Sequence, residues 1–129
     1  MHAVSATPQR WKPNVTVAAV VEQAGRFLLV EEDTADGLKL NTPAGHLELA
    51  ESPLQAVVRE VLEETGRQFH PSAFLGAYMS RVLRQGTQED ITYLRLAYCG
   101  TVSAPLAGQV LDTGIVRTLW MTPEELRDC

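Results

Sequence analysis

Cysteine is scarce in this sequence: Cys99 and Cys129 are the only two among 129 residues, and no Cys-x-x-Cys pair occurs. This argues against a disulfide framework and against a zinc site built from paired cysteines. Long apolar runs are also missing, because none approaches the roughly 18 residues that a membrane-spanning helix needs. The N-terminal residues lack the apolar core of a signal peptide. These absences predict a cytoplasmic protein with reduced thiols and no membrane partner.

Positive charge is also in short supply. The chain has 11 Lys and Arg residues against 16 Asp and Glu residues, which gives a net charge of −5. A general nucleic-acid binder would carry a basic patch, so the composition argues against that class. Small phosphorylated ligands remain compatible, because metal ions can screen the acids locally. The length predicts one domain, residues 1–129, with residues 1–12 as a flexible lead-in, working as a monomer or a homodimer.

Several segments have the apolar, β-branched composition that predicts strands. They are residues 14–22, 26–32, 38–40, 69–83, 91–102 and 115–121. Pro71 and Gly76 are expected to interrupt the fourth of these segments. Pro43 and Gly45 argue against regular structure in the connection 41–45.

A helix is predicted at residues 53–65. Ser52 is placed to cap its N-terminus, Pro53 fits the first helical position, and Gln55 completes a capping box. Gly66 is placed to end the helix in a left-handed conformation. At about 100° per residue, one apolar stripe results, and we expect it to be buried. Its members are Leu54, Val57, Val58, Val61 and Leu62.

Three glutamates, Glu60, Glu63 and Glu64, share the opposite face of this helix, with Arg59 beside them. Carboxylates three and four positions apart repel by about 0.2–0.5 kcal/mol per pair, and Arg59 offsets only part of this repulsion. The helix dipole also disfavours anions in the C-terminal half. A hard divalent cation would offset the remaining repulsion among the carboxylates, because carboxylate oxygens are its preferred ligands. By itself, the face is equally compatible with a solvated charged surface and with a metal site.

The stretch 45–67 resembles the Nudix box, which reads Gly, five residues, Glu, seven residues, then Arg-Glu-apolar-x-Glu-Glu-x-Gly-apolar. The matching positions are Gly45, Glu51, Arg59, Glu60, Val61, Glu63, Glu64 and Gly66. Arg67 departs from the pattern at the final apolar position, and we expect Phe69 to take over its packing role. A match of this length around a capped helix favours the metal site. Residues 12–18, 43–48 and 94–96 also resemble the NudJ-type phosphatases of this family.

The resemblance implies an α+β fold, an α/β/α sandwich with a mixed β-sheet, and the order of predicted elements is compatible with it. A capping box at residues 122–125 predicts a last, short helix. The resemblance also implies hydrolysis of pyrophosphate bonds with Mg²⁺, for which Mn²⁺ can substitute. It assigns residue roles by matching position: Gly45, Glu60, Glu63 and Glu64 bind metal, Arg59, Glu60 and Glu63 are catalytic, and Glu51 is accessory.

The substrate-binding residues have no such motif. Arg95 is the first candidate, because it stands mid-strand among apolar neighbours, on the same face as Tyr93, and needs a partner there. A structural salt bridge is an equal alternative. His46 is a candidate for contact with a phosphate, with a structural role as its alternative. Lys39 and Arg81 are further candidates.

A late acid is expected to complete the metal site, because many members of the family have one. Glu89, Asp90 and Asp112 are the candidates, with ordinary surface charge as the first interpretation of each. Tyr78 and Tyr93 are able to stack on a ring, although packing in the core is the usual role of such residues.

Three functions stay open. The first is a Mg²⁺-dependent hydrolase that releases phosphate from nucleoside di- and triphosphates or from thiamine-pathway pyrophosphates. The second is a Nudix pyrophosphatase acting on ADP-ribose or dinucleoside polyphosphates. The third is a non-catalytic Nudix ligand sensor, against which the complete set of Arg59 and three glutamates argues. In the first two, the partner is a small-molecule pyrophosphate.

Overall fold

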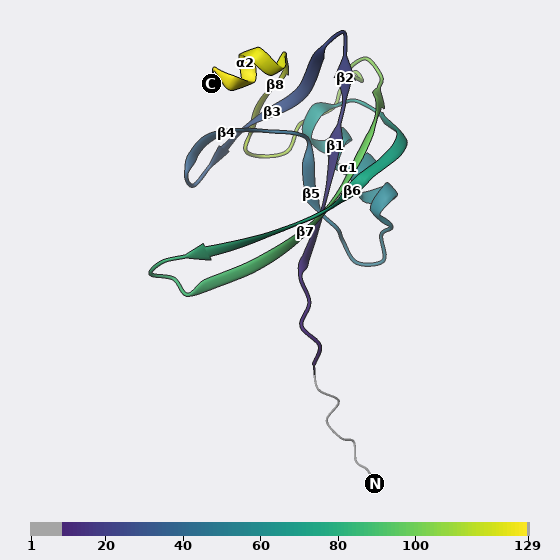
Figure 1. The fold of residues 1–129 in the computed structure, drawn as a ribbon. Coiled ribbons are helices and arrows are strands. Elements are labelled where there is room, and N and C mark those ends of the chain that lie inside the picture. The colour runs from purple at the N-terminus through teal and green to yellow at the C-terminus, as the bar shows by residue number, and fades with distance from the viewer. Residues whose placement is uncertain (1–8, 129) are drawn as a thin grey trace.

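The computed structural model describes residues 9–128, which form two β-sheets and two helices (Figure 1). One sheet has the order β5-β1-β7-β6, with bounds Ala44–His46, Asn14–Val20, Glu89–Val102 and Phe69–Arg84. The other contains β2 (Glu22–Gln23), β3 (Arg26–Thr34), β4 (Gly37–Asn41) and β8 (Ile115–Met121). The helices are α1 (Pro53–Thr65) and α2 (Pro123–Arg127). β1 and β7 pair in parallel and the other neighbours are antiparallel, so the predicted mixed sheet is confirmed.

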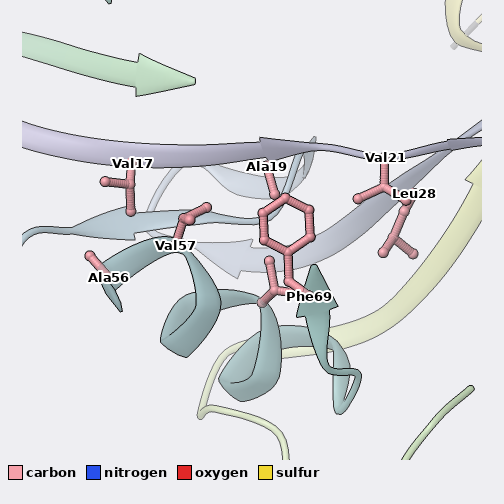
Figure 2. Close-up of a cluster of buried hydrophobic side chains, with 8 residues drawn as sticks. Val17, Ala19, Val21, Leu28, Ala56, Val57 and Phe69 are labelled. Carbon is pink, nitrogen blue, oxygen red and sulfur yellow. The ribbon is translucent and has the colours of Figure 1, made fainter. Parts of the chain in front are cut away.

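A buried apolar cluster joins α1 to the first sheet (Figure 2). Val17 and Ala19 come from alternate positions of β1, Val57 comes from α1, and Phe69 opens β6. Leu28 of β3 brings the second sheet into the same cluster. Each fully buried Val, Leu or Phe side chain contributes about 1.5–3 kcal/mol. This cluster holds the helix that carries the glutamates against β1, the strand that pairs with Gly45 of β5.

Both ends of α1 are as predicted. The Ser52 side chain accepts from the Gln55 backbone N–H, and the Gln55 side chain accepts from the Ser52 N–H, which is a complete capping box. Gly66 ends the helix with φ 70°, a conformation that costs residues with a Cβ more than it costs glycine.

The buried face of α1 differs from the predicted stripe. Val57 and Val61 are buried as expected, but Leu54 is 50% exposed, and Glu60 and Glu64 are buried. The prediction for Leu54 was therefore wrong, and the burial of Glu60 and Glu64 argues against a solvated charged surface, the alternative that the helix alone left open. Apolar periodicity does not reveal this rotation, because it assumes that the most apolar stripe faces the core. Here the helix instead turns the carboxylates of Glu60 and Glu64 toward residues 44 and 45.

The connection to α1 is more regular than predicted. Ala44–His46 forms β5, which pairs antiparallel with β1, so Gly45 lies inside a strand and not in an irregular loop. β6 is one continuous strand paired with β7. The predicted breaks appear as two register shifts, between Pro71 and Ala73 and between Phe74 and Gly76. Such bulges bend a strand without ending it.

The far half of the β6–β7 hairpin projects away from the rest of the molecule (Figure 1). We call residues 78–93 the arm. Its tip lies near the β3–β4 turn, where Arg84 and Asp36 are 3.9 Å apart. Within residues 9–128, neither helix has the length and apolar composition that crossing a membrane requires. Residues 1–8, most of the predicted lead-in, lie outside the described part of the chain.

Candidate active site

A cleft of about 440 Å³ lies where β5 meets the buried face of α1. α1 contributes Glu60 and Glu64, β5 contributes Gly45 and His46, and Arg95 reaches the cleft from β7. The cleft therefore collects residues that are far apart in the sequence. Other described residues that line it are Thr16, Glu32, Asn41, Ala44 and Glu48.

Gly45 and Glu60 are in direct contact. A Cβ atom added to Gly45 would overlap the carboxylate of Glu60. Glycine is thus required here for close approach, and not for a left-handed backbone, because Gly45 is not among the residues with positive φ. The Gly45 backbone and the Glu60 carboxylate consequently share one small space.

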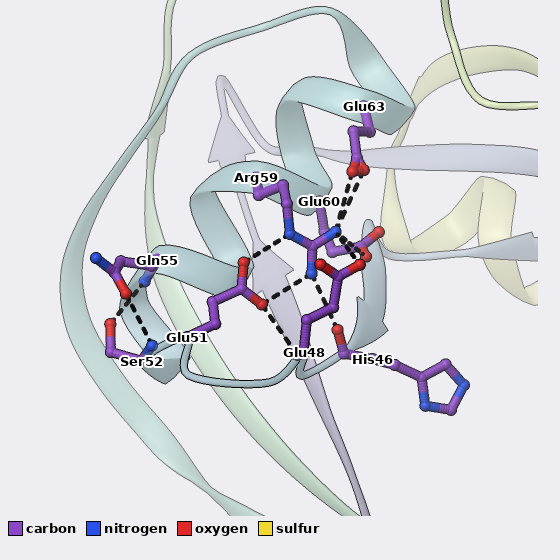
Figure 3. A network of polar contacts seen from close by, with 8 residues as sticks. All are labelled: His46, Glu48, Glu51, Ser52, Gln55, Arg59, Glu60 and Glu63. Carbon is purple, nitrogen blue, oxygen red and sulfur yellow. Dashed lines mark hydrogen bonds and ion pairs between the residues drawn. The ribbon is translucent and has the colours of Figure 1, made fainter.

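Arg59 gathers the surrounding carboxylates (Figure 3). Its Nε and Nη2 donate to both oxygens of Glu51, at 2.6 and 3.0 Å. Its Nη1 donates to Glu60 at 2.8 Å and to Glu63 at 3.0 Å. Nη2 also donates to the carbonyl of His46 at 3.0 Å, which ties β5 to the helix. One rigid guanidinium therefore sets the orientation of three glutamates and of the backbone next to Gly45.

The same contacts determine how these acids titrate. The hydrogen bond from Arg59 lowers the pKa of Glu51, and the surrounding carboxylates raise the pKa of Arg59 further above its usual range. Burial raises the pKa of Glu60, although Arg59 opposes this. Burial raises the pKa of Glu64 to about 8, against which the hydrogen bond from the Ala44 N–H, at 3.0 Å, acts only in part. Two buried acids are thus poorly compensated by the protein alone.

We expect Glu64→Gln to stabilise the metal-free protein at high pH. Glu64 binds its proton more tightly when folded (pKa about 8) than when unfolded (4.5), so its stabilising contribution is complete below 4.5 and is lost as pH rises toward 8. Glutamine keeps an acceptor for Ala44 and carries no charge. The melting temperature should therefore rise by several degrees at about pH 8 and change little at about pH 4.5.

Thermal unfolding in buffer with chelator measures this difference. Glu124→Gln on α2 is the control, because the Glu124 side chain is 71% exposed and only 3.8 Å from Arg127 in a surface pair. An equal change in melting temperature for Glu64→Gln at both pH values would contradict the argument from burial.

The acids of this region fit a hard divalent cation. Carboxylate oxygens of Glu60, Glu63 and Asp112 all lie within 4.8 Å of one another. The Asp112 N–H donates to the Glu63 carbonyl at 2.9 Å, which holds the loop before β8 beside the helix. Oxygen donors of this kind are the ligands of Mg²⁺ and Mn²⁺. The absence of a side chain on Gly45 lets the Glu60 carboxylate lie against β5, and the donor set suits an ion.

Of the three late acids, Asp112 is the one that the structure places with the glutamates. Glu89 and Asp90 lie on the arm, where Asp90 accepts from Arg81 at 2.7 Å and Glu89 lies 3.4 Å from Arg84. Arg81 therefore forms a bidentate surface pair and is not among the residues that line the cleft, and its role in substrate binding stays a prediction. Lys39, on β4, is exposed and is not among the residues that line the cleft.

Arg95 and His46 both line the cleft, as their candidacy required. Thr16, Glu32 and Asn41 line it too, and sequence reasoning missed them. Nothing local marks these residues, because they reach the cleft through strand pairing. The only indication in the sequence that Thr16 would reach the cleft was its place in the predicted strand 14–22. In the structure, Thr16 is paired in register with Arg95.

Arg67, the residue that departs from the Nudix box, contacts an aromatic ring and a backbone carbonyl. Arg67 lies over the ring of Trp120, 5.6 Å from its centroid, and its Nη1 donates to the carbonyl of Ser103 at 3.0 Å. Its Nε is buried without a hydrogen-bond partner among the described residues. Phe69 is buried in the core beside α1, so the expectation that it packs there is confirmed.

Comparison with known proteins places this chain in a family. The NUDIX domain matches residues 11–128. The chain is 37% identical over 117 residues to a protein named phosphatase NudJ from Escherichia coli strain K12, covering 90% of this chain and 72% of that protein. It is 49% identical to a solved NUDIX hydrolase from Nitrosomonas europaea, with a TM-score of 0.82, covering 91% of this chain and 77% of the other.

A more distant structure has the same fold. An ADP-ribose pyrophosphatase from Streptococcus suis aligns with a TM-score of 0.66 at 18% identity, covering 86% of this chain and 75% of that one. At this identity the likeness concerns the fold alone, and the α+β fold with a mixed sheet is confirmed. Because the domain match spans nearly all described residues and the NudJ likeness covers most of both chains, this chain belongs to the Nudix hydrolase family.

Proposed function

We propose that this protein is a Mg²⁺-dependent hydrolase of pyrophosphate bonds in small molecules, working as a single domain. The substrates we assign to it are nucleoside di- and triphosphates or thiamine-pathway pyrophosphates, from which it releases phosphate. Family membership and the likeness to phosphatase NudJ support the class of reaction. No described feature favours ADP-ribose over these substrates.

The observation that carries the proposal is that one cleft is lined both by an arginine, Arg95, and by Glu60 of the carboxylate cluster. Glu60 contributes to the cluster with Glu63 and Asp112, and also lines the cleft that contains Arg95. Acids alone attract a cation, and an arginine alone attracts an anion. A cleft holding both suits a metal–pyrophosphate complex, whose two parts carry opposite charge.

We assign each residue a role from its contacts and from its position in the Nudix box. Glu60, Glu63, Glu64 and the Gly45 carbonyl would hold the metal, and Asp112 would complete the set. Arg59 orients Glu60 and Glu63 by direct hydrogen bonds, and Glu51 holds Arg59 in turn. These bonds keep the carboxylates in place although they repel one another.

The reaction adds one water molecule to the substrate. The water oxygen forms a new bond to one phosphorus, the bridging P–O bond breaks, and the bridging oxygen leaves with the other phosphate. When bound, Mg²⁺ neutralises charge on the phosphates, polarises the water and stabilises the leaving oxygen. The proton of the water goes to a carboxylate. We assign this role to Glu63, whose side chain is 33% exposed against 11% for Glu60. Arg95 binds a phosphate that does not react and so positions the substrate.

Activity should depend completely on a divalent cation. Excess chelator should abolish phosphate release, and Mg²⁺ or Mn²⁺ should restore it, because the clustered acids cannot otherwise approach a charged substrate. Purified protein is assayed with nucleotides and thiamine diphosphate by the release of free phosphate. With ADP-ribose it is assayed by the formation of AMP and ribose 5-phosphate, because cleavage of that pyrophosphate bond releases no free phosphate. Turnover that persists at full rate in chelator would eliminate the metal mechanism, and selective cleavage of ADP-ribose would replace the proposed substrates.

A further inference from the structure

One row of side chains crosses all four strands of the first sheet. His46 on β5 is paired in register with Thr16 on β1, Thr16 with Arg95 on β7, and Arg95 with Tyr78 on β6. Residues in register project from the same face of a sheet. The row therefore begins beside Gly45, at the glutamates, and ends at the base of the arm. Its three strand spacings cover about 14 Å.

Arg95 stands in the middle of this row without a partner. Among the described residues, no hydrogen bond or ion pair to its side chain occurs, whereas Arg59, Arg81 and Arg117 each have a carboxylate partner. Arg95 is also only partly exposed. A half-buried guanidinium that is left unpaired is suited to an anionic ligand group. Its place in the row tells where that group would lie relative to the glutamates.

Beyond Arg95 lies a second hollow, of about 380 Å³. Thr16 and Arg95 line both this hollow and the glutamate cleft, so the two adjoin at these residues. Tyr78 and Tyr93 line the hollow from the arm. Tyr78 is 55% exposed, so its expected packing in the core was wrong.

The ring of Tyr78 is placed by its own strand. An added Cβ on Gly76 would lie 3.1 to 3.4 Å from atoms of this ring. The ring thus lies over the bare backbone of Gly76. Tyr93 lies two positions from Arg95 on the same face of β7 and its ring centroid is 6.3 Å from that of His46. Two aromatic rings therefore border the hollow on both sides of the unpaired arginine.

We propose that this hollow binds a planar ring carried by the substrate, while Arg95 binds the phosphate that connects the ring to the scissile bond. The inference rests on the proposed function and deepens it. It assigns the residues that would distinguish ring-bearing diphosphate esters, such as nucleoside diphosphates and thiamine diphosphate, from ring-free polyphosphates. Exposed aromatic side chains provide a stacking surface for such rings without specifying which ring is bound.

The test compares ring-bearing with ring-free substrates. For wild type and variants, kcat/KM is measured with ADP, with thiamine diphosphate and with inorganic tripolyphosphate. Tyr78→Ala should lower the ratio of ring-bearing to ring-free kcat/KM by about 5- to 100-fold, the usual worth of one stacking contact. Tyr78→Phe should restore most of the ratio, because the ring stays. Arg95→Gln should lower kcat/KM for all three substrates.

Phe74→Ala is the matched control, because Phe74 is an equally exposed aromatic residue of β6 that lines a different hollow, beside Tyr98. It should leave the ratio unchanged. If Tyr78→Ala also leaves the ratio unchanged, or lowers all three substrates alike, the ring site is refuted while the hydrolase proposal stands. If wild type cleaves none of the three, the hydrolase proposal fails instead. ADP binding by calorimetry then decides the ring site, and equal affinities for wild type and Tyr78→Ala would refute it.

Discussion

Glu60→Gln is expected to lower kcat by about 10²-fold or more while changing KM little. Glu60 is buried, touches the Gly45 backbone, accepts from Arg59 at 2.8 Å and shares its cluster with Glu63 and Asp112. Glutamine preserves the shape and the helix but removes the negative charge. A charge needed mainly in the transition state affects kcat, because substrate binding in the ground state loses little.

Steady-state kinetics with saturating Mg²⁺ measure the effect, and circular dichroism checks that the variant folds. Glu124→Gln is again the control, since it makes the same chemical change on the exposed α2. If Glu60 served only to neutralise Arg59, the change would cost at most about 1 kcal/mol of stability and leave the rate intact. A folded Glu60→Gln protein with wild-type kcat would therefore remove Glu60 from the catalytic machinery.

Gly45→Ala is expected to reduce activity by a similar factor through a different cause. The added methyl group would overlap the Glu60 carboxylate, so either the carboxylate or β5 must move. Displacement by about 1 Å can cost about 10²-fold when reacting groups must be aligned. Gly108→Ala is a matched control in an exposed loop, where an added Cβ meets nothing within 4 Å, although its φ of 78° will cost some stability.

A double-mutant cycle tests whether the damage passes through Glu60. In a Glu60→Ala background the space beside Gly45 is vacant, so adding Gly45→Ala should cost little further activity. Independent effects that multiply in the double variant would show that Gly45→Ala acts elsewhere, for example by weakening the pairing of β5 with β1.

Features that depend on residues close together in the sequence were predicted correctly. The capping box of Ser52 and Gln55 and the left-handed Gly66 lie as expected, because each depends on residues a few positions apart. The buried face of α1 was not predicted correctly. Leu54 is half exposed and Glu60 is buried, since the face is chosen by what packs against the helix and not by the most apolar stripe.

The contacts of the site residues were also predictable within one helix and not predictable between distant segments. Arg59 and Glu63 are four positions apart on one helix, so their contact follows from helical geometry alone. Arg81 was a reasonable phosphate ligand by charge, yet β6 pairs it with Asp90 across the arm. Asp112 was one of three equivalent acids until the loop before β8 brought it beside Glu63.

The sequence by itself determined the family, the capped helix and the spacing of Arg59 and the three glutamates along it, because these are properties of one contiguous segment. The tertiary structure alone decided which acids are buried, which late acid joins them, and the row from His46 through Thr16 and Arg95 to Tyr78. That row joins four strands far apart in the chain. Its register depends on long-range pairing, which no local pattern of residues encodes.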